Sequence, residues 1–343
     1  MLAAMTNYRL SVLDQSPIAA GRSAAHALKD TIALAQACDA AGYDRYWLAE
    51  HHASPGLAGA APEALIGPVA LATRRIRVGS GGVMLPHYSP FKVAETFKLL
   101  AALAPGRIDL GLGRAPGSDQ RTAFALQRDR SRRMPVDDFP PNLAELLAYL
   151  GDGLPADHPF AILHETLPSG GGAIEPWLLG SSTDSARWAG ETGLPYCIAD
   201  FINSDGLPQA ELYRRSFRSS RWLDKPHLMV ATWTIAAENR AEAERLAMPA
   251  RMMFAALVRG ELIPVPSVET AAEWAEGKAP PARNRRTVLG SPAEVKAELD
   301  SVAAMYGADE MMLVNIMPGI GPRIASYEAI AREYGLAPLA AAA

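Results

Sequence analysis

The stretch RIRVGSGGVMLPHYSPFKVAETFKLLAALAPGRIDLGLG (75–113) decides the fold. Two short runs rich in apolar residues and glycine, 75–85 and 106–113, flank a segment, 89–103, whose apolar residues recur at helical spacing. Ser89 and Pro90 are typical of a helix start. The order strand, helix, strand, with strands that are mostly continuous apolar runs, indicates a parallel sheet covered by helices.

The same alternation extends in both directions to the ends of the chain. It predicts eight strands, each followed by a helix. Eight such units in 343 residues favour an α/β fold of the (β/α)8 TIM barrel type over an open doubly wound sheet. No GxGxxG sequence follows the first strand, which argues against a dinucleotide-binding sheet. The predicted strands are 9–14, 43–50, 75–85, 106–113, 175–180, 194–200, 227–237 and 309–317.

We expect one barrel domain over residues 1–343. Two long segments interrupt the alternation, at about 114–141 and 260–288, and we interpret them as insertion loops at the C-terminal face of the barrel, long enough to act as lids. The alanine-rich end, 337–343, is typical of a frayed tail.

The bulk composition excludes several classes of protein. A net charge of -4 gives no electrostatic reason to expect nucleic acid or an anionic membrane as a partner. No apolar run approaches the roughly 18 residues that a membrane span needs. Cys38 and Cys197 lie far apart in apolar stretches, as reduced core cysteines do. With no signal peptide evident at the N-terminus, we expect a cytoplasmic protein.

The functional residues of a barrel gather where its strands end, at the C-terminal face. The fifth predicted strand runs into GSSTD (180–184), a hydroxyl-rich turn that opens a helix and therefore presents unpaired N–H groups to an anion. Ser181 and Ser182 could add side-chain hydrogen bonds, and Arg114, at the end of the neighbouring strand, a forked cation. The alternative is that Ser182 only caps the helix and Arg114 only pairs with a surface acid.

The glycine pair Gly81-Gly82 has two interpretations as well. Glycine inside a strand marks either a bulge or a close approach of the backbone to a ligand. A flat ring system needs such a bare surface to lie against, so the pair is a candidate ring-binding site.

The cluster Glu50-His51-His52 follows the second predicted strand. Strand alternation places Glu50 and His52 on one face and His51 on the other. Without an H-x-H pair in the chain, a metal site is disfavoured, and we predict none. A histidine at a barrel mouth suits proton transfer or hydrogen bonding, and simple packing is the remaining alternative.

These strand ends resemble those of the bacterial-luciferase-like, flavin-dependent monooxygenases, and in particular a widespread bacterial subgroup of luciferase-like oxidoreductases. The resemblance spans nearly the whole chain. It is carried by DRYWLAEHH (44–52), RVGSGGVMLPHYSP (77–90), GRIDLGLGRAPGSDQRT (106–122) and PWLLGSSTDSARWAGETGLP (176–195).

The resemblance implies a barrel that holds FMN at the strand C-termini. It places the flavin phosphate at Arg114 and the turn Gly180-Ser181-Ser182, with Ser185 as a further candidate. It matches Gly81-Gly82 to a cis peptide under the isoalloxazine ring, His51 to a catalytic histidine beside the flavin, and Glu50 to an acid that organises the ring site. One departure is Asp184, whose negative charge in the first helical turn puts the role of Ser185 in question.

The function implied is an FMN-dependent monooxygenase that uses reduced FMN and O2 through a flavin hydroperoxide to oxygenate a small apolar, aldehyde- or ketone-like substrate. Val83, Met84 and Leu85 would supply an apolar lining that excludes water. Because no nicotinamide-binding domain is evident, we expect a separate flavin reductase, and by resemblance a homodimer. The alternatives are a flavin- or deazaflavin-dependent reductase or dehydrogenase, a non-catalytic flavin-binding protein, and a metal-dependent hydrolase built on Glu50-His51-His52.

Overall fold

The structure is a computed structural model, and it describes residues 8–114, 120–127, 131, 138–276 and 285–338. Residues 115–119, 128–130 and 132–137 of the predicted segment 114–141 lie outside these ranges, as do residues 277–284 of the second predicted insertion and the last five residues of the predicted tail.

Eight parallel strands close into a barrel, as predicted. The hydrogen-bonded order is β1-β2-β3-β4-β5-β6-β7-β9, and β9 pairs again with β1. Nearly every residue of these strands is buried, because side chains fill the interior and helices cover the outside. The barrel strands are β1 (Arg9–Asp14), β2 (Arg45–Leu48), β3 (Arg77–Met84), β4 (Ile108–Gly113), β5 (Glu175–Gly180), β6 (Tyr196–Ile198), β7 (Leu228–Ala236) and β9 (Glu310–Val314).

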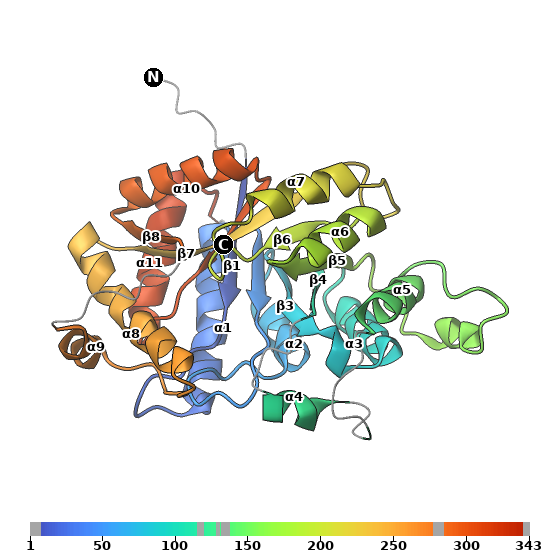
Figure 1. The fold of residues 1–343 in the computed structure, drawn as a ribbon, viewed down its shortest axis with the longest axis horizontal. Coiled ribbons are helices and arrows are strands. Elements are labelled where there is room, and N and C mark those ends of the chain that lie inside the picture. The colour runs from blue at the N-terminus through green and yellow to red at the C-terminus, as the bar shows by residue number, and fades with distance from the viewer. Residues whose placement is uncertain (1–7, 115–119, 128–130, 132–137, 277–284, 339–343) are drawn as a thin grey trace, which may run out of the picture.

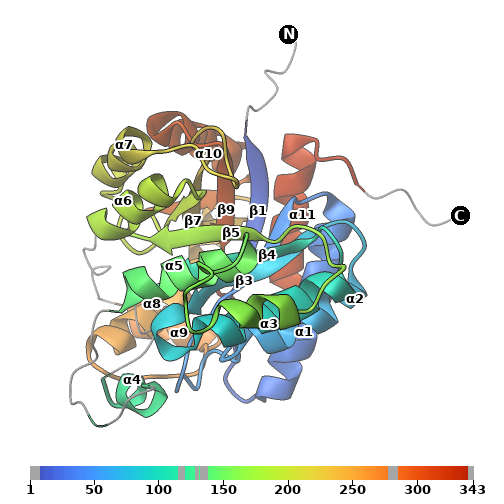
Figure 2. The ribbon, with the colours of Figure 1, turned by 90° about the vertical axis from the view of Figure 1, so that its right-hand side faces the viewer.

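Helices surround this barrel (Figures 1 and 2). Their ends follow local sequence signals: Ser291 forms a capping box with Glu294, and Gly193 ends a helix with a φ of 65°. They are α1 (Ala24–Ala41), α2 (Pro62–Ala72), α3 (Pro90–Leu103), α4 (Gln120–Leu126), α5 (Phe139–Leu150), α6 (Thr183–Thr192), α7 (Leu207–Ser216), α8 (Arg240–Val258), α9 (Val268–Ala275), α10 (Pro292–Tyr306) and α11 (Ile320–Tyr334), with 3-10 turns η1 (Leu85–His87) and η2 (Ala161–Thr166). Every described helix is too short or too polar to cross a membrane.

The predicted insertions contain more regular structure than expected. Within 260–288 lie α9, which begins where the Ser267 side chain accepts from the Thr270 N–H, and the start of a ninth strand, β8 (Thr287–Gly290). β8 pairs only with β7 and lies outside the closed ring. It was missed because four residues between a charged segment and a helix give almost no periodicity. The other insertion holds α4, which lies below the carboxyl ends of the strands in both views (Figures 1 and 2).

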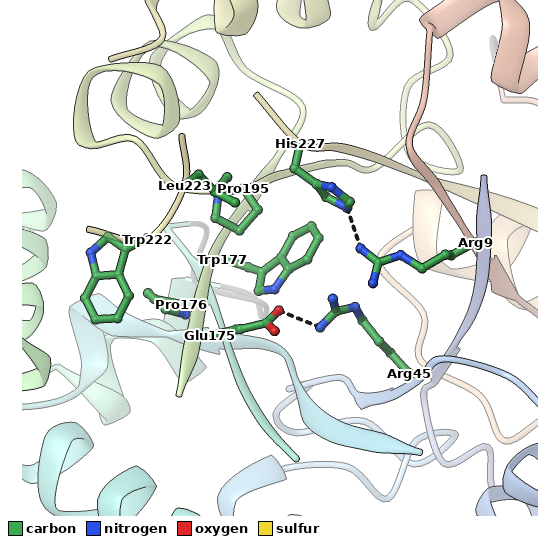
Figure 3. A pocket seen from close by; sticks show the side chains of 9 residues that line it. All are labelled: Arg9, Arg45, Glu175, Pro176, Trp177, Pro195, Trp222, Leu223 and His227. Atoms are coloured by element: carbon green, nitrogen blue, oxygen red, sulfur yellow. Dashed lines mark hydrogen bonds and ion pairs between the residues drawn. The ribbon is translucent and has the colours of Figure 1, made fainter. Parts of the chain in front are cut away.

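One buried arginine closes the amino-terminal end of the barrel. Arg45, at the start of β2, forms ion pairs with Asp109 of β4 at 2.8 Å, Glu175 of β5 at 2.9 Å and Glu310 of β9 at 3.1 Å. Figure 3 shows Arg45 joined to Glu175 beside the Trp177 ring, whose centroid is 4.9 Å from the guanidinium carbon. The small cavity of about 210 Å³ at this end is therefore lined by charges that already pair with one another.

Replacing Arg45 with methionine should lower the free energy of unfolding by about 3–5 kcal/mol, because the fully buried carboxylates of Asp109 and Glu310 would lose their shared cation. Urea denaturation followed by circular dichroism measures the change. Arg9→Met is the matched control, because Arg9 is half-exposed and pairs with Glu310 at 3.5 Å, and its expected cost is below about 1 kcal/mol. Equal losses in the two variants would contradict this account of the barrel end.

Candidate functional site

A cavity of about 510 Å³ opens at the carboxyl ends of the strands. The nine residues predicted as catalytic or cofactor-binding all line it, so the structure brings together groups from the carboxyl ends of β2, β3, β4 and β5 and from the start of α6. These nine are Glu50, His51, Gly81, Gly82, Arg114, Gly180, Ser181, Ser182 and Ser185. The remaining wall is mostly apolar and is made by Leu13, Gln15, Trp47, Ala49, Met84, Gly113, Leu179, Cys197, Ala199, Phe201, Ile202, Ala231 and Met312.

The glycine pair forms one side of the cavity, and the bond between Gly81 and Gly82 is a cis peptide. The strand register shifts between Ser80 and Val83, so the bulge interpretation is confirmed, and the close approach of a ligand stays a prediction. A Cβ on Gly82 would lie 2.5 Å from Leu179 Cδ1 and 2.7 Å from the Gly111 carbonyl oxygen. Close packing against β4 therefore leaves no room for a side chain at Gly82, and Gly81 and Gly82 line the cavity with backbone alone.

The turn after β5 is held rigidly. The Ser182 hydroxyl accepts from the Ser185 N–H at 3.3 Å and so caps α6, while Gln209 Nε2 donates to the Ser181 carbonyl at 3.1 Å. Helix-start N–H groups lack intrahelical acceptors and carry the positive end of the helix dipole. The turn can therefore receive an anion from the cavity.

Arg114 lies beside this turn. Its guanidinium is 3.3 Å from the Asp184 carboxylate and rests over the Trp188 ring, 5.2 Å from the centroid. Arg187 approaches the same carboxylate at 4.0 Å. Asp184 thus sits between two cations, which offsets the negative charge that the sequence placed near the anion site. Arg114 therefore forms the ion pair with an acid that was expected as one alternative, and it also lines the cavity.

Ser185 lines the cavity, but its hydroxyl already has protein partners. It donates to the Ser182 carbonyl at 2.9 Å and lies 3.0 Å from the Tyr196 hydroxyl. Tyr196, at the start of β6, was not singled out from the sequence, and its phenol also donates to the Gly180 carbonyl at 3.2 Å. These bonds make Ser185 a support of the turn, and direct contact with a ligand stays a prediction.

The Glu50 side chain is fully buried, and both of its carboxylate oxygens accept hydrogen bonds. Its carboxylate accepts from His52 Nε2 at 2.7 Å, from the Tyr88 hydroxyl at 3.0 Å and from the Met84 N–H at 3.0 Å. Burial and the neighbouring Glu50 carboxylate raise the pKa of Tyr88, which keeps that phenol a donor. Glu50 therefore fastens β2 to the start of the loop after β3, and Glu50 and His52 share a face as predicted.

His51 points into the cavity on the other face. Burial, and to a lesser degree His52, lower its pKa to about 4, so the imidazole is neutral at pH 7. Its Nδ1 is buried and has no hydrogen-bond partner among the described residues. One ring nitrogen can therefore accept a proton or hydrogen bond from a ligand, and the other can donate.

The structure corrects part of the expected lining. Of Val83, Met84 and Leu85, only Met84 lines the cavity, whereas Val83 and Leu85 pack in the outer core between barrel and helices. Phe201, Ile202 and Cys197 were missed because they lie on and after β6, where the sequence has no motif. Burial raises the pKa of the Cys197 thiol. In the described residues, no three His, Cys, Asp or Glu side chains group to hold a metal ion.

A closed (β/α)8 barrel whose strand ends place a helix start, a glycine backbone and a neutral histidine around one cavity has the arrangement of an enzyme barrel. The model of the luciferase-like monooxygenases matches residues 8–310, and the chain belongs to this family of flavin-dependent oxygenating enzymes.

Three similar proteins support the assignment. A luciferase-like monooxygenase of Escherichia coli (strain K12) is 42% identical over 308 residues, 88% of this chain and 90% of that protein. The N-acetyl-S-alkylcysteine monooxygenase of Bacillus subtilis (strain 168) is 37% identical over 324 residues, 93% of this chain and 96% of that protein. The crystal structure of apo-MsnO8 superposes with a TM-score of 0.89 at 36% identity, covering 98% of this chain and 100% of that one.

The low pKa of His51 predicts a pH-dependent contribution to stability. In the unfolded chain the imidazole takes up a proton as the pH falls below 6.5, whereas in the folded protein it stays neutral down to about pH 4. The unfolded state therefore binds more protons in this window, and stability is lost as the pH falls through it. Between pH 7 and 4.5, the free energy of unfolding of the wild type should fall by about 2–3 kcal/mol more than that of His51→Asn. Parallel curves from urea melts of the two proteins would show that His51 is not held neutral.

Proposed function

We propose that this protein is an FMN-dependent monooxygenase that takes reduced FMN and O2 and oxygenates a small apolar substrate. The observation that carries the proposal is a single cavity with Arg114 and the Gly180-Ser182 turn on one side, bare glycine backbone on another, and neutral His51 beside it.

The residues fit the chemical parts of FMN. A phosphate suits Arg114 and the helix-start N–H groups of the turn, since both offer positive charge and hydrogen-bond donors. A planar ring suits Gly81-Gly82, where a Cβ has no room. When bound, reduced FMN would supply the electrons that activate oxygen.

The side chains of this protein would bind and orient the flavin and the substrate, and they would exclude water from the cavity. Leu13, Leu179, Ala231 and Met312 give the cavity an apolar wall that disfavours water beside the reacting atoms. His51, neutral and lining the cavity, would hold or accept a proton there. Glu50 would fix the end of β3, the strand that carries the glycines, because its carboxylate accepts from the Met84 N–H.

The apolar wall also limits the substrate. It favours a compact apolar group such as an aldehyde, a ketone or, as in the name of the Bacillus subtilis relative, an alkyl thioether. A separate reductase would provide reduced FMN. We place the enzyme in the cytoplasm, which the two free buried cysteines support.

Arg114→Ala should weaken FMN binding by about 1.5–3 kcal/mol, because a charge-assisted hydrogen bond to the phosphate is lost. Riboflavin, which has the same ring and no phosphate, should bind both proteins alike. Fluorescence titration of each flavin measures both effects. The control is Arg187→Ala, which removes a neighbouring cation that does not line the cavity. Loss of riboflavin binding in Arg114→Ala would contradict a phosphate role.

The oxygenase assignment has its own test. Wild-type protein supplied with reduced FMN should consume O2 in step with product when given aldehydes, ketones and alkyl thioethers. Replacing His51 with asparagine should slow turnover and leave FMN affinity nearly unchanged. Turnover of substrates without O2 uptake would instead indicate a reductase or dehydrogenase.

We also propose a homodimer. Leu71 on α2, and Leu99 and Leu103 on the adjacent α3, are 68%, 52% and 53% exposed, and apolar side chains of this size on neighbouring helices are typical of a subunit contact. Leu99→Lys should convert the dimer to a monomer in light scattering after size exclusion. Leu257→Lys on α8, where the leucine is 50% exposed, is the control. A monomeric wild type would refute the proposal.

A further inference from the structure

Gln15, directly after β1, is a buried polar residue that the site so far leaves unused. Its side chain lines the cavity, and the residue is only 6% exposed. Within the described part of the chain, its carboxamide makes no hydrogen bond. A carboxamide that lines a mostly apolar cavity and has no protein partner offers its donors and its acceptor to a ligand.

The backbone around Gln15 is firmly placed. Asp14 points outward and binds Arg323 of α11 at 2.7 Å and Thr31 of α1 at 2.7 Å, so Leu13 and Gln15 face the cavity. Ser16 has a φ of 49° and donates its N–H to Asp14 Oδ1 at 2.9 Å. The carboxamide is thus presented from a rigid site.

The order of strands in the barrel determines where Gln15 lies relative to the turn Gly180-Ser181-Ser182. In the ring order, β1 is four strands from β5 in either direction, so the two strands face each other across the cavity. A molecule whose phosphate lies at the turn after β5 presents its opposite end toward β1. Around Gln15 the wall is mostly apolar, with Leu13, Ala49 and Met312. Glu50 and His51 are the neighbouring polar residues, and the Glu50 carboxylate is already bonded within the protein.

We propose that Gln15 binds the pyrimidine edge of the flavin ring, an inference that rests on the proposed function. That edge places an N–H between two carbonyls, a pattern complementary to a carboxamide, which has one acceptor and donors side by side. The flavin N3–H donates to Gln15 Oε1, and Gln15 Nε2 donates to an adjacent ring carbonyl. Gln15 is therefore a cofactor-binding residue that sets how far the ring extends from the phosphate site toward His51.

A flavin methylated at N3 tests this contact. The wild-type protein should bind N3-methyl-FMN about tenfold more weakly than FMN, since the methyl group removes the donor. Gln15→Met, which is close in shape, should bind FMN about tenfold more weakly than wild type and discriminate less than about twofold between the two flavins. Titration of oxidised flavins by fluorescence needs no turnover. Gln36→Met is the control, because Gln36 lies on α1 and bonds only the Ala72 carbonyl.

Each result of these titrations either supports or overturns the contact between Gln15 and the flavin ring. Equal binding of the two flavins by wild type overturns the inference and leaves the proposed function standing, and this comparison needs no folded variant. An undiminished methyl penalty in Gln15→Met, or in Gln15→Leu as a second variant, also overturns it, since the methyl group would then clash elsewhere. Unchanged FMN affinity with a raised substrate KM assigns Gln15 to the substrate instead. Failure of wild type to bind FMN at all refutes the proposed function itself.

Discussion

The ion-pair cluster of Arg45 is the interaction on which the rest of the molecule depends. One guanidinium joins β2 to β4, β5 and β9, and Arg77 of β3 and Ser11 of β1 bind the same carboxylates. Burying these charges is favourable only because all are paired, and the pairing lowers the pKa of Glu310 to about 2 despite its burial. With the amino ends fixed at one point, the carboxyl ends of the same strands are held in a ring around the cavity.

The pairing of polar groups therefore differs between the two ends of the barrel. At the amino end, charged groups satisfy one another and no ligand is needed. At the carboxyl end, Asp14, Glu50 and Ser182 take up partners within the protein, whereas Gln15 and His51 line the cavity with no hydrogen bond from their side chains to the described residues. Asp14, Glu50 and Ser182 therefore position the backbone, and Gln15 and His51 form part of the cavity wall.

The eight barrel strands, and the meeting of Arg114, Ser182, Gly82 and His51, could be predicted from the sequence, because parallel strands must end on one face. Other features depend on distant contacts that no local pattern encodes. The charge of Asp184 is offset by Arg114 across the gap between β4 and α6, and Val83 faces outward only because the register shifts at the glycines. Short elements such as β6 and β8 carry too few residues to show which side chains reach the cavity.

The environment of Cys197 has a consequence for the durability of the catalyst. This thiol lines a cavity where oxygen would be activated, yet burial in an apolar wall raises its pKa and keeps it protonated. Oxidants attack the thiolate far faster than the thiol, and sulfenic acid formation follows thiolate character. Under the proposed function, this sulfur atom in the cavity wall would therefore react slowly with an oxidant formed beside it.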